Sequence, residues 1–253
     1  MISDAPTTLS ELVVLTVDSE SYTPTTVDLA IDMAASLKTR LQALFIEDEE
    51  LLRAADLPFT REIAFPSAMA RITNANIMQR SVQTIATQFK QYLGTRAQAS
   101  KVPWSYDYIR GCSRDVGLVG KPDVVYTIVS QAIYHRPRYQ YRRHSRKLLM
   151  IENHSPHLYK ALELIVRSFR NDAIEVLWIK NDSATTEIDV VKQYPALSGK
   201  NNLTTVQLEH SQLQQVVADR NMTFDYAIMS RNESADSLNE IFKQLRCPII
   251  LVS

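Results

Sequence analysis

A strand–helix–strand pattern that occurs twice is the feature that most constrains the fold of this chain. In the first copy, residues 11–48, the apolar run LVVLTVDS precedes an amphipathic helix at about 25–38 and the run LQALFIED. In the second copy, residues 147–182, the run KLLMIENHS precedes a helix at about 156–170 and the run AIEVLWIKN. Apolar strands that alternate with amphipathic helices are typical of a parallel sheet with helices on both faces. The sequence therefore predicts an α/β protein.

The repeat also predicts how the chain is divided. The 253 residues leave room for two domains of ordinary size. We expect two tandem, doubly wound parallel-sheet domains, over residues 1–134 and 148–253, joined by a basic linker at 135–147. The apolar run at 248–252 predicts a last strand, and such an edge needs a partner in the other half or in a second chain. We therefore expect a compact pseudo-twofold monomer or a homodimer of such monomers.

Further helices and strands are predicted around the repeated units. The segment from Leu51 to Pro66 begins in a short helix and continues as an irregular, lid-like stretch, and its role is not predicted. Apolar periodicity predicts the remaining elements. Helices are expected at 49–55, 71–99, 212–220 and 235–245, and strands at 104–109, 123–129, 203–209 and 226–229.

The composition bears on the cellular location of the protein and on the class of partner that it binds. Twenty-eight basic and 28 acidic residues cancel, so no global charge steers the protein toward nucleic acid or a membrane. The start, MISDAPTTLSE, lacks the basic and apolar regions of an export signal, and no apolar run approaches the roughly 20 residues of a membrane span. Cys112 and Cys247 are interpreted as reduced thiols. These features predict a cytoplasmic protein.

Three local segments resemble the universal stress protein family in its tandem form. The run VVLTVDSES is similar to the first strand of that family, which ends in an aspartate. The segment FIEDEELLRAADLPFTREI, residues 45–63, is similar to one seen in divergent tandem members. Cys247-Pro248 followed by IILV resembles the end of many family domains. The resemblance implies an adenine nucleotide alpha hydrolase-like fold with two domains that pack on each other like a dimer.

The resemblance further implies a nucleotide site. Of the features that form this site in the family, the sequence keeps only one residue, in the first half of the chain. Nucleotide-binding members use the aspartate that ends the first strand and a glycine-rich loop after the fourth strand, which wraps the phosphates. Asp18 matches the aspartate, whereas Glu152-Asn153 stands at that position in the second half. The segments after the fourth strands, SQAIYHRPRYQYRR and SRNESADSLNE, contain no glycine. A phosphate-binding loop needs consecutive inward-facing amides, usually at positive φ with no Cβ in the way.

Two functions remain open at this point. The missing loops favour a non-enzymatic stress-response or regulatory protein that binds no cofactor and acts through protein contacts. Asp18 and the retained first strand favour the alternative, a sensor that binds ATP or AMP in the first half. Asp18 then contacts the adenine or the ribose; otherwise it orders the turn at residues 19–23.

A basic segment is the one strong charge asymmetry in the sequence. Residues 131–147 contain six cations and no acid, and three tyrosines are interleaved with the arginines. This pattern suits a solvated linker whose cations pair with the protein's own acids, an anionic protein partner, or stacking and phosphate contacts with nucleic acid. The six cations are Arg136, Arg138, Arg142, Arg143, Arg146 and Lys147.

No local pattern in the sequence predicts catalysis or metal binding. His154 and His157 are an incomplete ligand set, and turn or helix-capping roles suit them better. The acidic run at 47–50 lacks the alternating spacing of a calcium loop and suits the start of a helix. No nucleophile–base pair, paired-carboxylate site or nucleophile elbow can be assembled. We therefore expect no enzymatic activity, although a weak ATPase stays an alternative.

Overall fold

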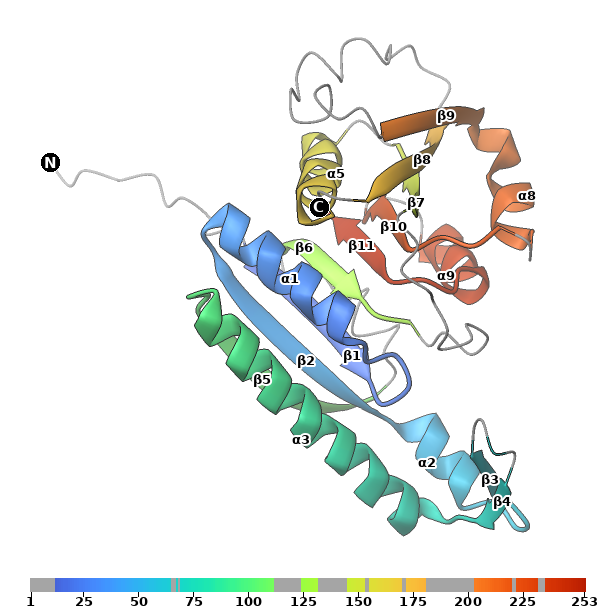
Figure 1. Cartoon of the computed structure of the whole chain (residues 1–253). Coiled ribbons are helices and arrows are strands. Elements are labelled where there is room, and N and C mark those ends of the chain that lie inside the picture. Colours follow the sequence, from blue (N-terminus) through green and yellow to red (C-terminus); the bar gives the residue numbers. More distant parts are fainter. Residues whose placement is uncertain are drawn as a thin grey trace, which may run out of the picture.

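The fold is seen in a computed structural model of the whole chain (Figure 1). The residues that the structure describes are 12–64, 67, 69–111, 124–131, 145–152, 155–169, 172–180, 203–219, 222–231 and 235–253.

Nine described strands form one sheet, in the order β5-β2-β1-β6-β11-β10-β7-β8-β9. The first four, from β5 to β6, are parallel to one another, and so are the last five, from β11 to β9. The expected α/β class with a mostly parallel sheet is thereby confirmed. The strands of the first half are β1 (Leu12–Asp18), β2 (Arg40–Asp48), β5 (Trp104–Gly111) and β6 (Val124–Val129). Those of the second half are β7 (Ser145–Ile151), β8 (Ala173–Lys180), β9 (Leu203–Glu209), β10 (Tyr226–Ser230) and β11 (Ile249–Val252).

The two halves join where β11 pairs with β6 in the antiparallel direction. Ile249 lies opposite Val129 and Val252 opposite Tyr126, and all four residues of β11 are buried. Ser253 extends the joint, because its amide donates to the carbonyl oxygen of Val125 at 3.1 Å. The edge strand at the end of the sequence therefore has its partner in the other half of the chain.

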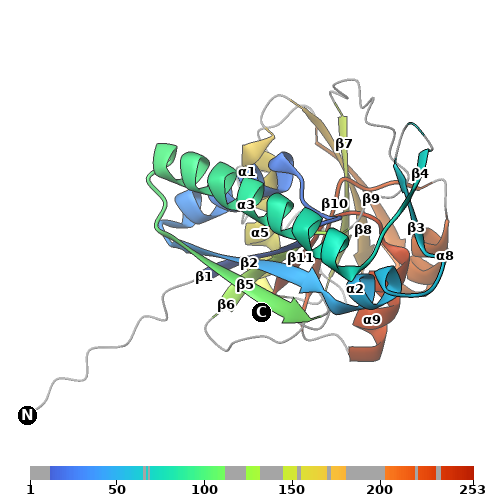
Figure 2. The same ribbon diagram turned by 90° about the horizontal axis from the view of Figure 1, so that it is seen from below.

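Helices cover both faces of the sheet (Figures 1 and 2). On one face α1 (Pro24–Leu37), α3 (Ala75–Ala99) and α5 (Pro156–Ser168) share one apolar core that runs through both halves. On the other face α8 (Leu213–Ala218) and α9 (Ala235–Gln244) pack against the second half of the sheet. Alternate residues of β7, β8, β10 and β11 enter the two cores, as the period of a strand dictates.

The start of α1 shows how local sequence determines a helix boundary. The Thr23 side chain accepts a hydrogen bond of 3.3 Å from the amide of Thr26, and Pro24 occupies the first helical position. The helix ends at Lys38, whose backbone is left-handed with φ of 54°. The observed bounds agree with the helix predicted at about 25–38.

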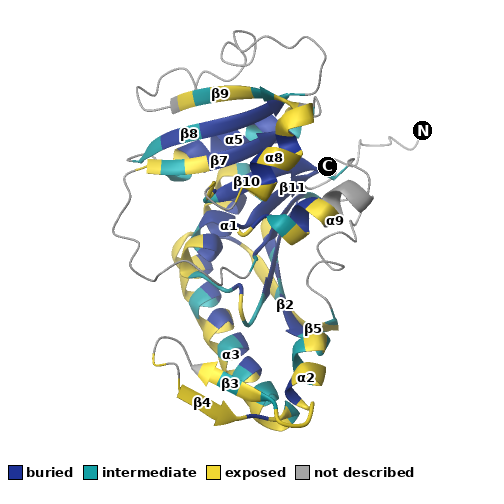
Figure 3. Cartoon of the chain, turned by 90° about the vertical axis from the view of Figure 1, so that its right-hand side faces the viewer, coloured by how far each residue is buried: buried dark blue, intermediate teal, exposed yellow. Residues whose placement is uncertain are grey.

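An arm of three short elements extends from the carboxyl ends of β2 and β5 (Figure 3). It consists of α2 (Glu49–Ala55), as predicted, and of β3 (Arg61–Ala64) and β4 (Met69–Ile72), which pair in the antiparallel direction. The prediction of an irregular stretch after α2 is wrong for residues 61–64, because they form β3. The expected helix start at residue 71 is also wrong, because Asn74 caps the helix by accepting from the amide of Ile77 at 2.9 Å. The remainder of the stretch up to Pro66 lies outside the described residues.

Two other boundaries differ from the predictions. The strand expected from residue 147 begins at Ser145, so the last three residues of the segment 135–147 belong to β7. The helix expected at 212–220 is α8 preceded by a 3₁₀ turn, η1 (His210–Gln212).

Candidate functional site

The crevice to test for a ligand lies between β1 and β6. In parallel α/β sheets ligands bind outside the carboxyl ends of the strands, at the point where the strand order reverses. In the first half this point lies between β1, which ends at Asp18, and β6, which is followed by Ser130. In the second half it lies between β7, followed by Glu152, and β10, followed by Arg231.

Asp18 orders the turn that follows β1. Its Oδ1 accepts hydrogen bonds from the amides of Glu20, at 2.9 Å, and Ser21, at 2.7 Å. In return the Asp18 amide donates to the Oγ of Ser21 at 2.9 Å. An aspartate side chain that binds amides two and three residues ahead is a standard turn device. The turn-ordering role considered from the sequence is therefore present, and the second carboxylate oxygen, Oδ2, has no bond from the described residues.

Ser130 ties this turn to the neighbouring strand. Its buried hydroxyl donates to the carbonyl oxygen of Ser21 at 2.5 Å, and its amide donates to the carbonyl of Thr16 at 2.9 Å. The crevice between the two strands is thus bridged by the protein's own hydrogen bonds. The sequence analysis did not identify Ser130; the available signal was a small hydroxyl residue directly after a predicted strand.

Carboxylates concentrate at this edge of the sheet. Burial, and then the negative charges of Asp18 and Asp48, raise the pKa of Glu20. An anionic ligand placed here would meet the same repulsion that disfavours the ionised form of Glu20.

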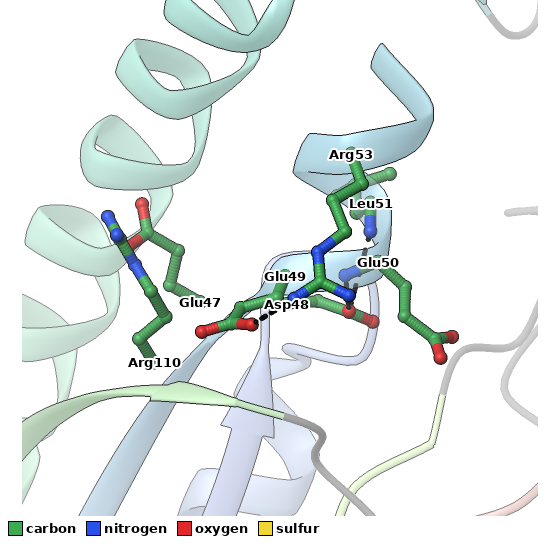
Figure 4. Close-up of polar contacts among 7 residues, drawn as sticks. All are labelled: Glu47, Asp48, Glu49, Glu50, Leu51, Arg53 and Arg110. Atoms are coloured by element: carbon green, nitrogen blue, oxygen red, sulfur yellow. Dashed lines mark hydrogen bonds and ion pairs between the residues drawn. The ribbon is translucent and has the colours of Figure 1, made fainter. Parts of the chain in front are cut away.

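The acidic run at 47–50 stabilises the base of the arm (Figure 4). Asp48 caps α2, because its Oδ1 accepts from the amides of Glu50, at 2.8 Å, and Leu51, at 3.4 Å. Glu49 pairs with Arg53 one turn later at 3.0 Å. The interpretation of this run as a solvated helix start is confirmed for residues 48–50, whose negative charges favour the helix dipole, and is wrong for Glu47, which is buried in β2.

Glu47 is the buried member of the run. Only 2% of it is exposed, and its Oε2 accepts from the Nε of Arg110, on the adjacent strand β5, at 2.9 Å. Partial burial of the ring and the neighbouring Glu47 carboxylate raise the pKa of Tyr108 to about 12. Glu47 and Arg110 were not singled out from the sequence, since only the sheet register brings them together.

In the second half, Glu152 stands at the position equivalent to Asp18, and both of its carboxylate oxygens accept hydrogen bonds from the protein. Glu152 is 2% exposed; its Oε1 accepts from the hydroxyl of Tyr159, and its Oε2 accepts from the Nε1 of Trp178 at 2.9 Å. Both oxygens therefore serve internal donors, which makes Glu152 a structural residue.

Arg231 follows β10, where the resemblance places the start of the second phosphate loop. Its amide donates to the carbonyl of Val252 at 2.8 Å, and its side chain crosses β11 to donate to the hydroxyl of Thr127 on β6. Burial lowers the pKa of the Arg231 guanidinium. This cation therefore links the two halves of the sheet, and the sequence analysis did not identify it.

The basic segment is described only at its end. Arg146 binds Asp172 at 2.8 Å and lies 3.6 Å from Asp225, while Lys147 binds Glu175 at 3.2 Å. These two cations pair with the protein's own acids. The other four, Arg136, Arg138, Arg142 and Arg143, lie outside the described residues.

Three cavities of the described residues lie away from Asp18. One of about 550 Å³ lies between the carboxyl ends of α1 and α5 and is lined by Asp32 and Arg167. The others lie beside Gln212 and Phe224. Within the described ranges, no group of three or more metal-ligating side chains forms a metal site.

Two further expectations can be compared with the described residues. None of their helices is long and apolar enough to cross a membrane. Cys247 is buried as a thiol in the core of the second half, as expected, whereas Cys112 and His154 lie outside the described part of the chain.

Comparison with known proteins finds similarity only among solved structures. No family model matches the sequence, and no curated protein is significantly similar to it. A universal stress protein from Archaeoglobus fulgidus is 8% identical, with a TM-score of 0.44 and 96% of each chain covered. A putative universal stress protein from Pseudomonas aeruginosa is 7% identical, with a TM-score of 0.37 over 96% of this chain and 92% of that one. These two carry the name of the family that the sequence resembles.

A third similar structure has no assigned function. It is a protein from Pseudomonas aeruginosa described as functionally unknown, 7% identical, with a TM-score of 0.39. The match covers 96% of this chain and 92% of that one.

Proposed function

We propose that this chain is a non-enzymatic, cytoplasmic regulatory protein of the stress response that has lost nucleotide binding and acts through protein contacts. The observation that carries the proposal is the crevice beside Asp18, which is bridged by hydrogen bonds and surrounded by carboxylates. The stress-response assignment rests on the sequence resemblance at residues 13–21, 45–63 and 247–252.

The argument against a nucleotide is first one of charge. A triphosphate would bring about four negative charges next to Asp18, Glu20 and Asp48. Each pair of like charges at about 4 Å costs roughly 1–4 kcal/mol near a protein surface. Two cations near this edge in the described part of the chain are already paired, since Arg110 is bound to Glu47 and Arg53 to Glu49.

The second argument concerns main-chain donors. The segments after β6 and β10 contain no glycine, so close approach of consecutive amides to phosphate is disfavoured. Two of the amides that follow β1 already have acceptors, since those of Glu20 and Ser21 bind Asp18.

Isothermal titration of the full-length chain with ATP, ADP and AMP tests the proposal. We expect no saturable heat up to about 1 mM nucleotide, which corresponds to a binding free energy weaker than about −4 kcal/mol. An Asp18→Asn variant is the matched control, because it removes one charge and keeps the shape of the side chain.

The alternative function, a sensor of ATP or AMP in the first half, is favoured by one observation. The Oδ2 of Asp18 accepts no bond from the described residues and lies at the end of β1, where the resemblance places a contact to adenine or ribose. Saturable binding that is lost in Asp18→Asn would replace the proposed function with this one.

A further inference from the structure

A cavity of about 260 Å³ lies toward the amino ends of β7 and β8. It is therefore not the crevice at the carboxyl ends of the strands, where parallel sheets usually bind their ligands. Pockets for drug-sized molecules measure about 300–1,000 Å³, so this one suits a smaller ligand. Two strands and the segment that leads into β10 line it: Lys147, Leu148, Glu175, Leu177, Met222, Thr223 and Phe224.

The sheet register places a pair of opposite charges in this cavity. Lys147 lies opposite Glu175 on the neighbouring strand, and the Nζ of the lysine is 3.2 Å from the Oε2 of the glutamate. Leu177, two residues further along β8, lies on the same face of the sheet as Glu175. The side chain of Lys147 is 50% exposed and that of Glu175 is 39% exposed, so solvent reaches the pair. The cavity thus offers a cation and an anion side by side, next to an apolar residue.

Hydrogen bonds fix the segment that forms the third side of the cavity. The amide of Asp225 donates to the carbonyl oxygen of Lys147 at 2.7 Å, and the amide of Lys147 donates to the Oδ2 of Asp225 at 2.9 Å. At the other end of the segment, the amide of Met222 donates to the carbonyl oxygen of Asp219 at 3.0 Å. The protein's own bonds therefore hold this side of the cavity in place.

The apolar part of the cavity includes a side chain that the fold leaves uncovered. Outside residues 57–72, no large apolar residue in the described ranges is more exposed than Met222, which is 45% exposed. Phe224, by contrast, is 7% exposed and packs in the core of the second half. A methionine thioether is flexible and adapts to apolar groups of different shape. The cavity therefore suits a ligand with an apolar group of variable shape.

We propose that this cavity binds a free α-amino acid with an apolar side chain. Lys147 pairs with the carboxylate of the ligand and Glu175 with its ammonium group. The side chain of the ligand lies against Met222 and Leu177. The inference goes beyond the proposed function, because it gives a protein that acts through protein contacts a small-molecule regulator. It does not depend on the loss of nucleotide binding.

Charge complementarity favours a zwitterion over an acid or an amine. An α-amino acid carries both of its charges on one carbon, so both can meet the two side chains, which lie 3.2 Å apart, at the same time. A ligand with one charge would leave either Lys147 or Glu175 without its partner. The pair itself opens at little cost, since ion pairs that are more than a third exposed on both sides contribute little to stability.

Isothermal titration of the full-length chain with L-leucine, L-methionine and L-phenylalanine tests this inference. We expect saturable binding of at least one of them with a dissociation constant below about 1 mM, which is within reach of a ligand of this size. Two further probes isolate the charges: 4-methylpentanoate is leucine without the ammonium group, and 3-methylbutylamine is leucine without the carboxylate. Each should bind at least tenfold more weakly than leucine, because it meets only one of the two side chains.

Three variants place the binding in this cavity. Lys147→Met keeps the apolar stem and removes the charge, whereas Glu175→Gln keeps the shape and removes the charge. Each should weaken amino acid binding at least tenfold while the far-ultraviolet circular dichroism spectrum stays unchanged. Lys243→Met is the matched control, because it removes the same charge from an exposed residue of α9 that does not line the cavity, and it should bind as the wild type does.

Three results would overturn the inference. The first is the absence of saturable heat for all three amino acids up to about 10 mM, ten times the weakest expected dissociation constant. The second is 4-methylpentanoate or 3-methylbutylamine binding as tightly as leucine, and the third is wild-type affinity in both Lys147→Met and Glu175→Gln. Each is independent of the nucleotide titration, so the two proposals can fail separately.

Discussion

The hydroxyl of Ser130 donates a 2.5 Å hydrogen bond to the carbonyl oxygen of Ser21, a residue 109 positions earlier in the chain. This bond joins the turn after β1 to the end of β6 at the point where α/β sheets usually bind ligands. Asp18 orders the same turn from its first residue, since it accepts from the amides of Glu20 and Ser21. Hydrogen bonds therefore hold both ends of the turn at the edge of the sheet.

Replacing Ser130 by alanine should lower the free energy of unfolding by about 1–2 kcal/mol, because the carbonyl of Ser21 loses its buried donor. Urea unfolding followed by circular dichroism measures the change. Ser81→Ala is a suitable control, since the Ser81 hydroxyl bonds within an exposed helix and its loss should change stability by less than about 0.5 kcal/mol. Equal stability of Ser130→Ala and the wild type would show that the bond contributes nothing.

Glu152→Gln should lower the free energy of unfolding by about 2 kcal/mol. The neutral amide has one acceptor oxygen, so it cannot replace both of the charge-assisted bonds that the carboxylate accepts from the Tyr159 hydroxyl and the Trp178 N–H. Chemical denaturation at pH 7 measures the loss. Glu175→Gln breaks a more exposed pair with Lys147 and should cost less than about 1 kcal/mol. Similar losses in both variants would contradict the structural role of Glu152.

Glu20→Gln should stabilise the protein at neutral pH. Burial, followed by the charges of Asp18 and Asp48, raises the pKa of Glu20 above its usual 4.5, so the folded state binds this proton more tightly than the unfolded state. Ionisation of Glu20 therefore costs stability as the pH rises above about 4.5. The gain in free energy of unfolding should be below about 1 kcal/mol at pH 7, because the side chain is partly exposed and solvent screens the neighbouring charges.

Urea unfolding of wild type and Glu20→Gln at about pH 4, 5.5 and 7 distinguishes ionisation from other effects. The difference should shrink toward zero at the lowest pH, where the carboxyl is protonated in both states. A gain that is the same at all three values would assign it to the change of shape.

Phe59→Gly should be more stable than Phe59→Ala by about 1 kcal/mol. Phe59 has a left-handed backbone with φ of 66°, which glycine adopts readily and alanine does not. Both variants remove the exposed ring, so the difference between their free energies of unfolding measures the cost of the left-handed backbone at residue 59. Thermal unfolding measures this difference, and alanine as stable as glycine would show that the backbone changes conformation.

Much of the fold was predictable from local sequence. The alternation of apolar strands and amphipathic helices predicted the α/β class, and the bounds predicted for α2 and β9 match those observed. The cap at Thr23 was predictable because capping depends on residues three positions apart. The two roles of Asp18 were both recognised, since an aspartate at the end of a strand suits a turn as well as a ligand.

Contacts between residues far apart in the chain were decided only by the tertiary structure. The Glu47–Arg110 pair and the bond from Trp178 to Glu152 depend on which strands become neighbours. The antiparallel pairing of β11 with β6 is of the same kind, because the sequence required only a partner for that edge. Periodicity along the chain determines the kind of element and its buried face, whereas burying many apolar faces at once determines which elements meet.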